Sequence, residues 1–294
     1  MEKVGLWKDE YKTGIEEIDI QHRQLFAKIE RLILIAKVGD IEKNRQECEN
    51  IVDFLADYTI SHFASEEALQ KKLGYVNYEQ HVKLHQQFKN TVLKYKKNME
   101  TDFSKSLLKS FVGTLLTWLV MHVCTCDKKI ITNEPIDPRK DFSNKESLIR
   151  SVAETCLTGH YGIPITGMEP CIYKGYVEGK VIVRNLITVQ KKYQFLYGFS
   201  ETLAKAIYLK ACNMYLENPN KLDDMEKSAF IEIGNSLSTY AVMQHFKGRV
   251  VSLQSEGEVY RDKFTDSSFD INNNILLDIS TKYGSLEIMY CNIP

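Results

Sequence analysis

Apolar residues recur at helical spacing through the first 131 residues of the chain. Between Glu16 and Lys37 they stand on one helical face, at Ile18, Leu25, Ile29, Leu32 and Ala36. A later segment repeats the pattern, at Leu108, Phe111, Leu115, Leu119 and Val123. Short polar breaks at residues 38–40, 73–77 and 99–102 divide this half into four helical segments. Because such short loops join antiparallel neighbours, the pattern predicts an up-and-down four-helix bundle over residues 1–131.

The pattern changes after residues 132–145, a charged segment with two prolines that we interpret as a linker. Ser143-x-x-Glu146 then has the spacing of a capping box and predicts a helix to about Cys156. Further helices are predicted at residues 201–216 and 224–246. Runs of β-branched and aromatic residues predict strands at 171–177, 180–189, 193–199, 249–253, 275–280 and 285–291. Because these strands are grouped rather than alternating with helices, residues 146–294 are predicted to form an α+β domain.

Composition and charge narrow the class of protein. The chain has 294 residues, 44% hydrophobic and 26% charged, which fits two globular domains. Its 38 basic and 39 acidic residues leave no basic excess for nucleic acid. We expect no membrane span, because Thr117 and His122 interrupt the apolar run from Leu115 to Cys124. The first residues lack the apolar core of a secretory signal, so we expect a cytoplasmic protein with reduced cysteines.

Five histidines fall at one end of the predicted bundle when helix direction is taken into account: His22, His62, His81, His85 and His122. Glu66 stands four residues after His62, and Asp127 stands five residues after His122. Any one histidine alone is more simply a core or surface residue, but five at one end predict a metal site. With two bridging carboxylates and a bridging oxo or hydroxo ion, the donors fall one bond short of two six-coordinate metals. The open position could take dioxygen, and the donor types favour iron without excluding zinc or manganese.

The motifs around these residues resemble those of the bacterial hemerythrins. The entry segment Trp7-x-x-x-Tyr11-x-Thr13-Gly14-Ile15-x-x-Ile18-Asp19-x-Gln21-His22 is similar to that family's N-terminal signature. The segments His62-Phe63-x-x-Glu66-Glu67, His81-x-x-x-His85 and His122-x-x-x-x-Asp127 are similar to its ligand motifs. The resemblance implies that His81, His85 and His122 hold one iron, that His22 and His62 hold the other, and that Glu66 and Asp127 bridge them. It also implies that dioxygen binds at the iron held by two histidines.

Four apolar residues are candidates for a dry pocket beside the metals: Trp118, Leu119, Phe63 and Ile18. Trp118 lies one helical turn before His122, on the same face. A dry pocket matters because bound dioxygen leaves intact only where water and protons are excluded. The simpler interpretation is ordinary core packing. Cys124 and Cys126 form a C-x-C pair, but without a second cysteine pair nearby we expect no zinc site there.

In the second half, Glu232 and Asn235 share one face of the 224–246 helix, apart from an apolar stripe at Phe230, Ile233, Leu237, Tyr240 and Ala241. The spacing alone is weak, because residues 47–50 repeat it inside the bundle. The run from Phe230 to Leu237, with the order of helices and strands, resembles the CheC, CheX and FliY chemotaxis phosphatases, and in particular their CheX branch. Thr239 departs from the smaller residue often found there.

That resemblance implies a phosphatase mechanism. Asn235 would orient the water that attacks the aspartyl phosphate of a CheY-like response regulator, and Glu232 would pair with the regulator's lysine. The regulator itself would supply Mg²⁺, so that the phosphatase needs to contribute mainly positioning.

These features lead to one hypothesis and two alternatives. The hypothesis is a chemotaxis protein in which a di-iron domain senses oxygen or redox state and controls a CheX-like phosphatase. The first alternative is an oxygen-storage or delivery protein whose second domain is a non-catalytic docking module or forms a homodimer. The second alternative makes the iron site an oxidase or peroxidase. We interpret His160 and His245 as structural, and residues 159–167 as a turn.

Overall fold

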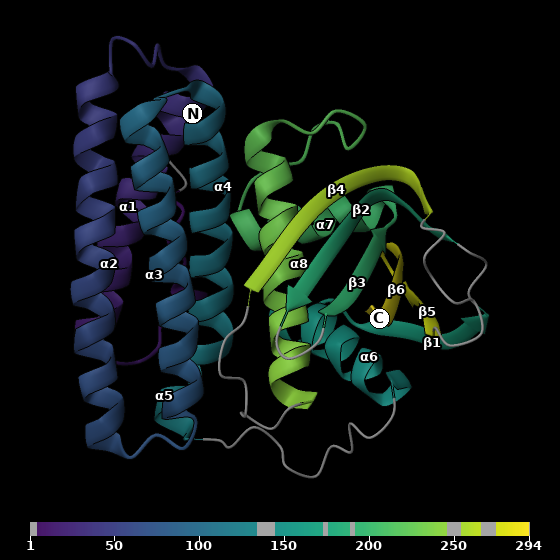
Figure 1. The fold of residues 1–294 in the computed structure, drawn as a ribbon. Coiled ribbons are helices and arrows are strands. Elements are labelled where there is room, and N and C mark those ends of the chain that lie inside the picture. The colour runs from purple at the N-terminus through teal and green to yellow at the C-terminus, as the bar shows by residue number, and fades with distance from the viewer. Residues whose placement is uncertain are drawn as a thin grey trace. The chain divides into compact units, whose positions relative to one another are not determined.

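The structure, a computed structural model, forms two compact units that divide after Ile136 (Figure 1). It describes residues 5–133, 145–172, 176–188, 192–245, 254–265 and 275–293. The predicted linker at residues 132–145 therefore lies largely outside the described residues. Each unit is considered by itself.

The first unit is a bundle of four long helices, as predicted. They are α1 (Glu16–Val38), α2 (Arg45–Leu73), α3 (Tyr78–Thr101) and α4 (Lys105–His122), after a short 3-10 turn at Asp9–Tyr11. Each helix contacts the next along the chain, and α1 contacts α4, which closes the ring. A π-helical turn, η2 (Val123–Asp127), continues α4 into the short α5 (Lys128–Thr132).

Turn residues set the ends of these helices. Gly74 follows α2 with a φ of +65°, in the left-handed region that favours glycine, and its backbone N–H caps the carbonyls of Gln70 and Lys71. Ser104 precedes α4, and its side chain accepts a hydrogen bond of 3.2 Å from the backbone N–H of Leu107. These caps hold the loops short, which keeps neighbouring helices antiparallel.

The stretch from Lys105 to Thr132 is long and apolar enough to cross a bilayer, with a mean hydropathy of 1.6. This differs from our expectation that the polar residues inside it would rule out such a stretch. However, 78% of its apolar window is buried inside the protein. That burial is typical of a core helix, because the stretch lies at the centre of the bundle's apolar packing.

The second unit combines one antiparallel sheet with three helices, which confirms the predicted α+β class. The strands are β1 (Ile165–Ile172), β2 (Tyr176–Thr188), β3 (Lys192–Phe199), β4 (Gln254–Thr265), β5 (Ile275–Thr281) and β6 (Gly284–Ile293), in the order β1-β5-β6-β3-β2-β4. The helices are α6 (Lys145–Ala153), which continues as the π-helical turn η3 (Glu154–His160), α7 (Glu201–Cys212) and α8 (Asp224–His245). All three helices contact the sheet: α8 contacts β2, β3 and β4, α7 contacts β2 and β6, and α6 contacts β5 and β6, while α8 also contacts α6 and α7.

Two strands differ from the prediction, and both lie at an edge of the sheet. Strand β1 includes residues 165–167, which we had interpreted as part of a turn, and it contains Pro170. Strand β4 has charged residues throughout, so its sequence lacks the apolar alternation of a buried strand. Charge and proline are common on edge strands, because one side of such a strand pairs with no neighbour. The predicted strand at residues 249–253 lies outside the described residues.

Candidate functional site

Seven polar side chains meet at one end of the bundle, and all are buried. They are the predicted set of His22, His62, Glu66, His81, His85, His122 and Asp127. His22 lies near the start of α1, and His62 and Glu66 lie in the second half of α2. His81 and His85 come from the start of α3, His122 ends α4, and Asp127 ends the π-helical turn η2. The up-and-down order brings these four helix segments to the same height, so residues a hundred positions apart become neighbours.

The start of α1 is fixed by Asp19. The backbone N–H and the hydroxyl of Thr13 donate to Asp19 Oδ1 at 2.7 and 2.8 Å, and the N–H of Gly14 donates to Oδ2 at 3.3 Å. Gly14 has a φ of +88°, a backbone conformation that favours glycine. These contacts hold the entry segment against the first turn, and His22 follows in the next turn.

Three histidines form a tight triangle. The Nε2 atoms of His81, His85 and His122 lie 3.0 Å from one another in all three pairs. An imidazole nitrogen either donates or accepts a hydrogen bond, so three mutual pairs cannot all join a donor to an acceptor. The triangle is instead the arrangement of three lone pairs that converge on one point, as they do around a cation.

The second pair of histidines lies across the two carboxylates. The Nε2 atoms of His22 and His62 are 3.1 Å apart. Glu66 Oε1 lies 2.8 Å from His81 and Oε2 lies 3.6 Å from His62, so its carboxylate spans the two groups. Asp127 spans them in the same way, with Oδ1 3.0 Å from His122 and Oδ2 3.4 Å from His22.

These donors fit a pair of cations. Glu66 Oε2 and both carboxylate oxygens of Asp127 are buried without a hydrogen-bond partner among the described residues, which is costly unless a cation meets them. With a metal–nitrogen bond of about 2.1 Å, nitrogens at right angles are about 3.0 Å apart and tetrahedral ones about 3.4 Å apart. The observed 3.0 Å triangle therefore matches one face of an octahedron better than a tetrahedral zinc site.

Charges within the cluster balance one another without a cation. Burial and the neighbouring His22 lower the pKa of His62 to about 3. Burial also opposes protonation of His81, but the closeness of Asp127 and Glu66 outweighs it and raises that pKa to about 9. Burial opposes ionisation of Asp127, yet His122 and His81 hold its pKa well below the usual range. Protons on the histidines of the cluster therefore offset the carboxylate charge, and a cation at the same place could take over that role.

The outer nitrogens of two of these histidines have partners to which the sequence reasoning gave no role. His62 Nδ1 lies 2.7 Å from Gln21 Oε1, and His85 Nδ1 lies 3.0 Å from Glu67 Oε1. The buried Gln70 donates to Glu66 Oε1 at 2.6 Å. Gln21 and Glu67 each stand beside a candidate ligand in the sequence, and Gln70 follows Glu66 by one helical turn. Their closeness to the ligands was the one feature of the sequence that could have identified them as outer partners.

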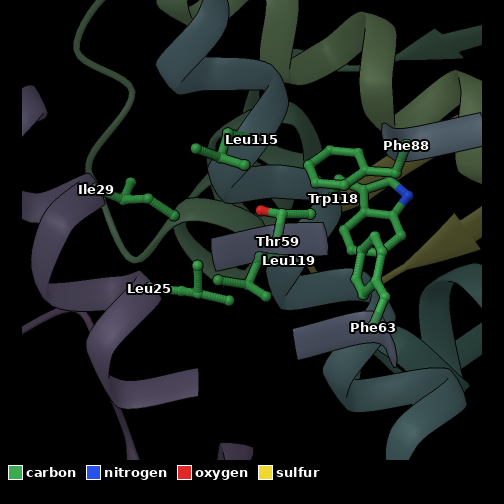
Figure 2. A pocket seen from close by; sticks show the side chains of 8 residues that line it. All are labelled: Leu25, Ile29, Thr59, Phe63, Phe88, Leu115, Trp118 and Leu119. Atoms are coloured by element: carbon green, nitrogen blue, oxygen red, sulfur yellow. The ribbon is translucent and has the colours of Figure 1, made fainter. Parts of the chain in front are cut away.

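An apolar cavity lies in the core of the bundle (Figure 2). Its lining residues are Leu25, Ile29, Thr59, Phe63, Phe88, Leu115, Trp118 and Leu119. Three of the four predicted pocket residues are among them. Ile18 is buried in the core but does not belong to this lining.

Aromatic rings connect this cavity to the histidines. The ring of Phe63 stacks on His85 with centroids 3.8 Å apart, and Trp118 stacks on His122 at 4.2 Å. Phe88 also stacks on Trp118, with centroids 3.7 Å apart, and Figure 2 shows both side chains in the lining of the cavity. These contacts fix two of the imidazole planes and keep the surroundings of the cluster apolar.

The second predicted site lies on α8. The carboxamide of Asn235 donates from Nδ2 to Glu232 Oε2 at 3.4 Å, so the two side chains do share one face. Asn185 on β2 donates from Nδ2 to Asn235 Oδ1. The sequence suggested an exposed polar face, but Glu232 is only 8% exposed and Asn235 is half-buried. Burial raises the pKa of Glu232 to about 7, against hydrogen bonds from Asn235 and Ser236 that lower it.

Two glycines allow this close approach of helix and sheet. A Cβ on Gly234 of α8 would lie 2.6 Å from Val183 Cγ1, and a Cβ on Gly257 of β4 would lie 2.5 Å from Ile231 Cγ2. The same Cβ on Gly257 would be 3.4 Å from Asn235 Oδ1. Asn185 and Gly257 lie on strands outside α8, so helical spacing within α8 gave no sign of them.

The other predicted groups do not extend these sites. No disulfide joins the cysteines in the part of the chain that the structure describes. Cys124 and Cys126 belong to the π-helical turn between His122 and Asp127. The side chains of His160, Tyr240 and His245 lie outside the described ones.

Comparison with known proteins shows which family the residues of the bundle resemble. The family model of the hemerythrin HHE cation binding domain matches residues 13–132. The bacteriohemerythrin of Pseudomonas paraeruginosa is 32% identical over 118 residues, which cover 40% of this chain and 73% of that protein. That of Stenotrophomonas maltophilia is 31% identical over 121 residues, with the same shares of both chains.

A comparison of folds returns chemotaxis proteins. The crystal structure of a chemotaxis protein CheX from Desulfovibrio desulfuricans is 19% identical and covers 49% of this chain and 96% of that chain, with a TM-score of 0.42.

Proposed function

The chain belongs to the hemerythrin family through its residues 13–132, and on that premise we propose that its helical unit is an iron-dependent sensor of dioxygen or redox state. The observation that carries the proposal is the convergence of five nitrogen and four oxygen donors on two neighbouring centres. Orphaned carboxylate oxygens between the two centres support it further.

The two centres differ in their donors. His81, His85 and His122, with one oxygen each from Glu66 and Asp127, would hold the first iron. His22 and His62, with the other oxygens of the same carboxylates, would hold the second. The second centre has one protein donor fewer, and a vacancy for a small ligand such as dioxygen belongs there. When bound, an iron pair would supply reversible redox chemistry toward dioxygen.

Apolar residues beside the cluster would help to keep water and protons away from it. Phe63, Trp118 and Leu119 line the apolar cavity, and the rings of Phe63 and Trp118 stack on His85 and His122 of the three-histidine centre. Such a cavity admits a small apolar gas more readily than water, which needs polar partners to enter. The chain's own contribution is therefore a dry, packed region on the three-histidine side of the cluster.

For the second unit we propose a phosphatase that acts on a phosphorylated CheY-like response regulator in chemotaxis. Its support is the E-x-x-N pair on α8, where the carboxamide of Asn235 is held between Glu232 and Asn185. A fixed carboxamide can orient one water for in-line attack, and the regulator would supply its own Mg²⁺ and lysine. The two units together would form a protein in which dioxygen or redox state sets the rate of dephosphorylation.

A non-catalytic second unit is the alternative, and the burial of the pair favours it. Glu232 is 8% exposed, and the carboxamide oxygen of Asn235 already accepts a hydrogen bond from Asn185. A docking or dimerisation module would need neither side chain at its surface. In that case the protein stores or delivers dioxygen.

Two measurements test these proposals on the full chain. Reconstitution with ferrous iron should load a pair of ions per chain and give a visible absorption band when air is admitted, which disappears when oxygen is removed. A chain that retains no iron would overturn the sensor. Phosphatase rates should then differ between oxygenated, deoxygenated and iron-free protein. Equal non-zero rates would contradict the proposal that the helical unit regulates the phosphatase. A zero rate in all three forms would favour the docking module.

A further inference from the structure

Two consecutive glutamates on α2 contact opposite ends of one histidine. Glu66 belongs to the cluster and lies 3.7 Å from His85 Nε2 through Oε1. Glu67 reaches the other side of the same imidazole, with Oε1 3.0 Å from Nδ1. The side chain of Glu67 is 26% exposed, so it is partly withdrawn from solvent. Helix α2 therefore places one carboxylate near each ring nitrogen of His85, and only the contact with Glu67 has hydrogen-bond length.

The position of the ring proton follows from these contacts. His85 Nε2 faces the other histidines of the triangle, so its lone pair is directed at the proposed metal position. Nδ1 must then carry the proton and donate it to Glu67. Phe63 stacks on the face of the same ring, which fixes the plane that this hydrogen bond needs.

The corresponding contact on the other centre is chemically different. His62 Nδ1 donates to Gln21 Oε1 at 2.7 Å, and this acceptor is a neutral amide. A carboxylate draws the ring proton more strongly than an amide does, and it leaves the imidazole a stronger electron donor at its opposite nitrogen. The two centres thus differ in the charge of their outer partners as well as in the number of their histidines.

We propose that Glu67 is a positioning residue that orients His85 and makes the three-histidine centre more electron-rich than the two-histidine centre. The proposal rests on the metal pair proposed above. A centre with stronger donors holds an oxidised ion better, so Glu67 lowers the reduction potential of the ion beside His85. Gln21 is a neutral acceptor, so His62 donates less electron density to the ion of the two-histidine centre.

The test compares three isosteric substitutions in the full chain. Glu67→Gln keeps an acceptor oxygen but removes the charge, and Gln21→Glu adds a charge at the other centre. Glu79→Gln is the matched control, because Glu79 is exposed in the first turn of α3 and close in sequence to His81. The readouts are the rate at which iron is lost to a chelator and the reduction potential of the iron pair.

We expect Glu67→Gln to lose iron about 10- to 100-fold faster than the control, with a potential shifted to more positive values. Gln21→Glu should shift the potential in the opposite direction. A Glu67→Gln protein that matches Glu79→Gln in both readouts overturns the role of Glu67. If the wild-type chain holds its iron pair in the same experiment, that result does not affect the proposed metal site. Should Glu67→Gln not fold, the sign of the Gln21→Glu shift decides, and no shift or a positive one overturns the proposal. A wild-type chain without iron overturns both proposals.

Discussion

Asp127 stands five residues after His122, and its Oδ1 nevertheless lies 3.0 Å from His122 Nε2. In a regular α-helix these two side chains would point about 140° apart. The π-helical turn at Val123–Asp127 adds a residue to the turn and returns Asp127 to the face of His122. One local irregularity therefore completes the anionic side of the cluster, and it does so at the end of the most deeply buried helix.

Asp127→Asn tests the need for that charge. The substitution keeps the shape but removes one anionic bridge, so we expect the iron pair to be lost or reduced to sub-stoichiometric binding. Iron per chain after reconstitution and desalting is the measurement. Asp102→Asn, at the exposed end of α3, is the matched control and should load normally. Full loading of Asp127→Asn would contradict the bridging role.

Leu119→Ala tests the packing of the cavity beside the cluster. Leu119 is buried, so its truncation should lower the free energy of unfolding by about 2 to 5 kcal/mol and enlarge the cavity. Urea unfolding followed by tryptophan fluorescence isolates the bundle, because both tryptophans, Trp7 and Trp118, lie in it. Leu73→Ala, at a half-exposed leucine, should change stability by less than about 0.5 kcal/mol. Equal effects of the two substitutions would mean that Leu119 does not support this packing.

The seven cluster residues could be predicted to lie together because the helices of a bundle with short loops are antiparallel. The position of a residue along its helix then gives its position along the bundle axis. His22, His62 and His122 needed only helix direction to be placed at one end. The outer partners Gln21 and Glu67 could not be assigned in this way, because a polar residue beside a ligand has the same spacing whether it faces solvent or a ring nitrogen. The π-helical turn was also hidden, since backbone irregularity has no periodic signal.

In the second unit the sequence predicted the buried strands better than the edges. The strands β1 and β4 pair on one side only, so charge and Pro170 are tolerated there and mask the alternation. The burial of Glu232 could not be foreseen either. Helical periodicity shows which residues share a face, but it does not show that strands β2 and β4 pack against α8.

Glu232→Gln tests the effect of this burial on stability. Burial raises the pKa of Glu232 from 4.5 to about 7, so the folded unit favours the uncharged form. The stability from this preference is fully present below pH 4.5 and is lost as the pH rises through 7. Glutamine stays neutral, so we expect the variant to gain up to roughly 3 kcal/mol over wild type at pH 8 and almost nothing at pH 4.

The measurement for Glu232→Gln is far-UV circular dichroism during urea unfolding of the full chain, with tryptophan fluorescence to assign the bundle's transition. Glu217→Gln, at an exposed position after α7, is the control and should show no pH-dependent difference. A difference between Glu232→Gln and wild type that is the same at both pH values would contradict the raised pKa.

Asn185→Ala tests whether the sheet positions the proposed catalytic carboxamide. Asn185 donates to Asn235 Oδ1, so its loss should remove one of the contacts that hold the Asn235 carboxamide in place, while Asn235 itself remains. We expect kcat for dephosphorylation of a phosphorylated response regulator to fall about 10- to 100-fold with little change in KM, because orientation is lost and binding is not. Asn235→Ala should abolish the activity, and Asn220→Ala, at an exposed position, should leave it unchanged. If Asn185→Ala keeps the wild-type rate while Asn235→Ala is inactive, the contact from β2 is structural. If neither substitution changes the rate, the carboxamide takes no part in the reaction, and the buried Glu232–Asn235 pair serves the packing of α8 against the sheet.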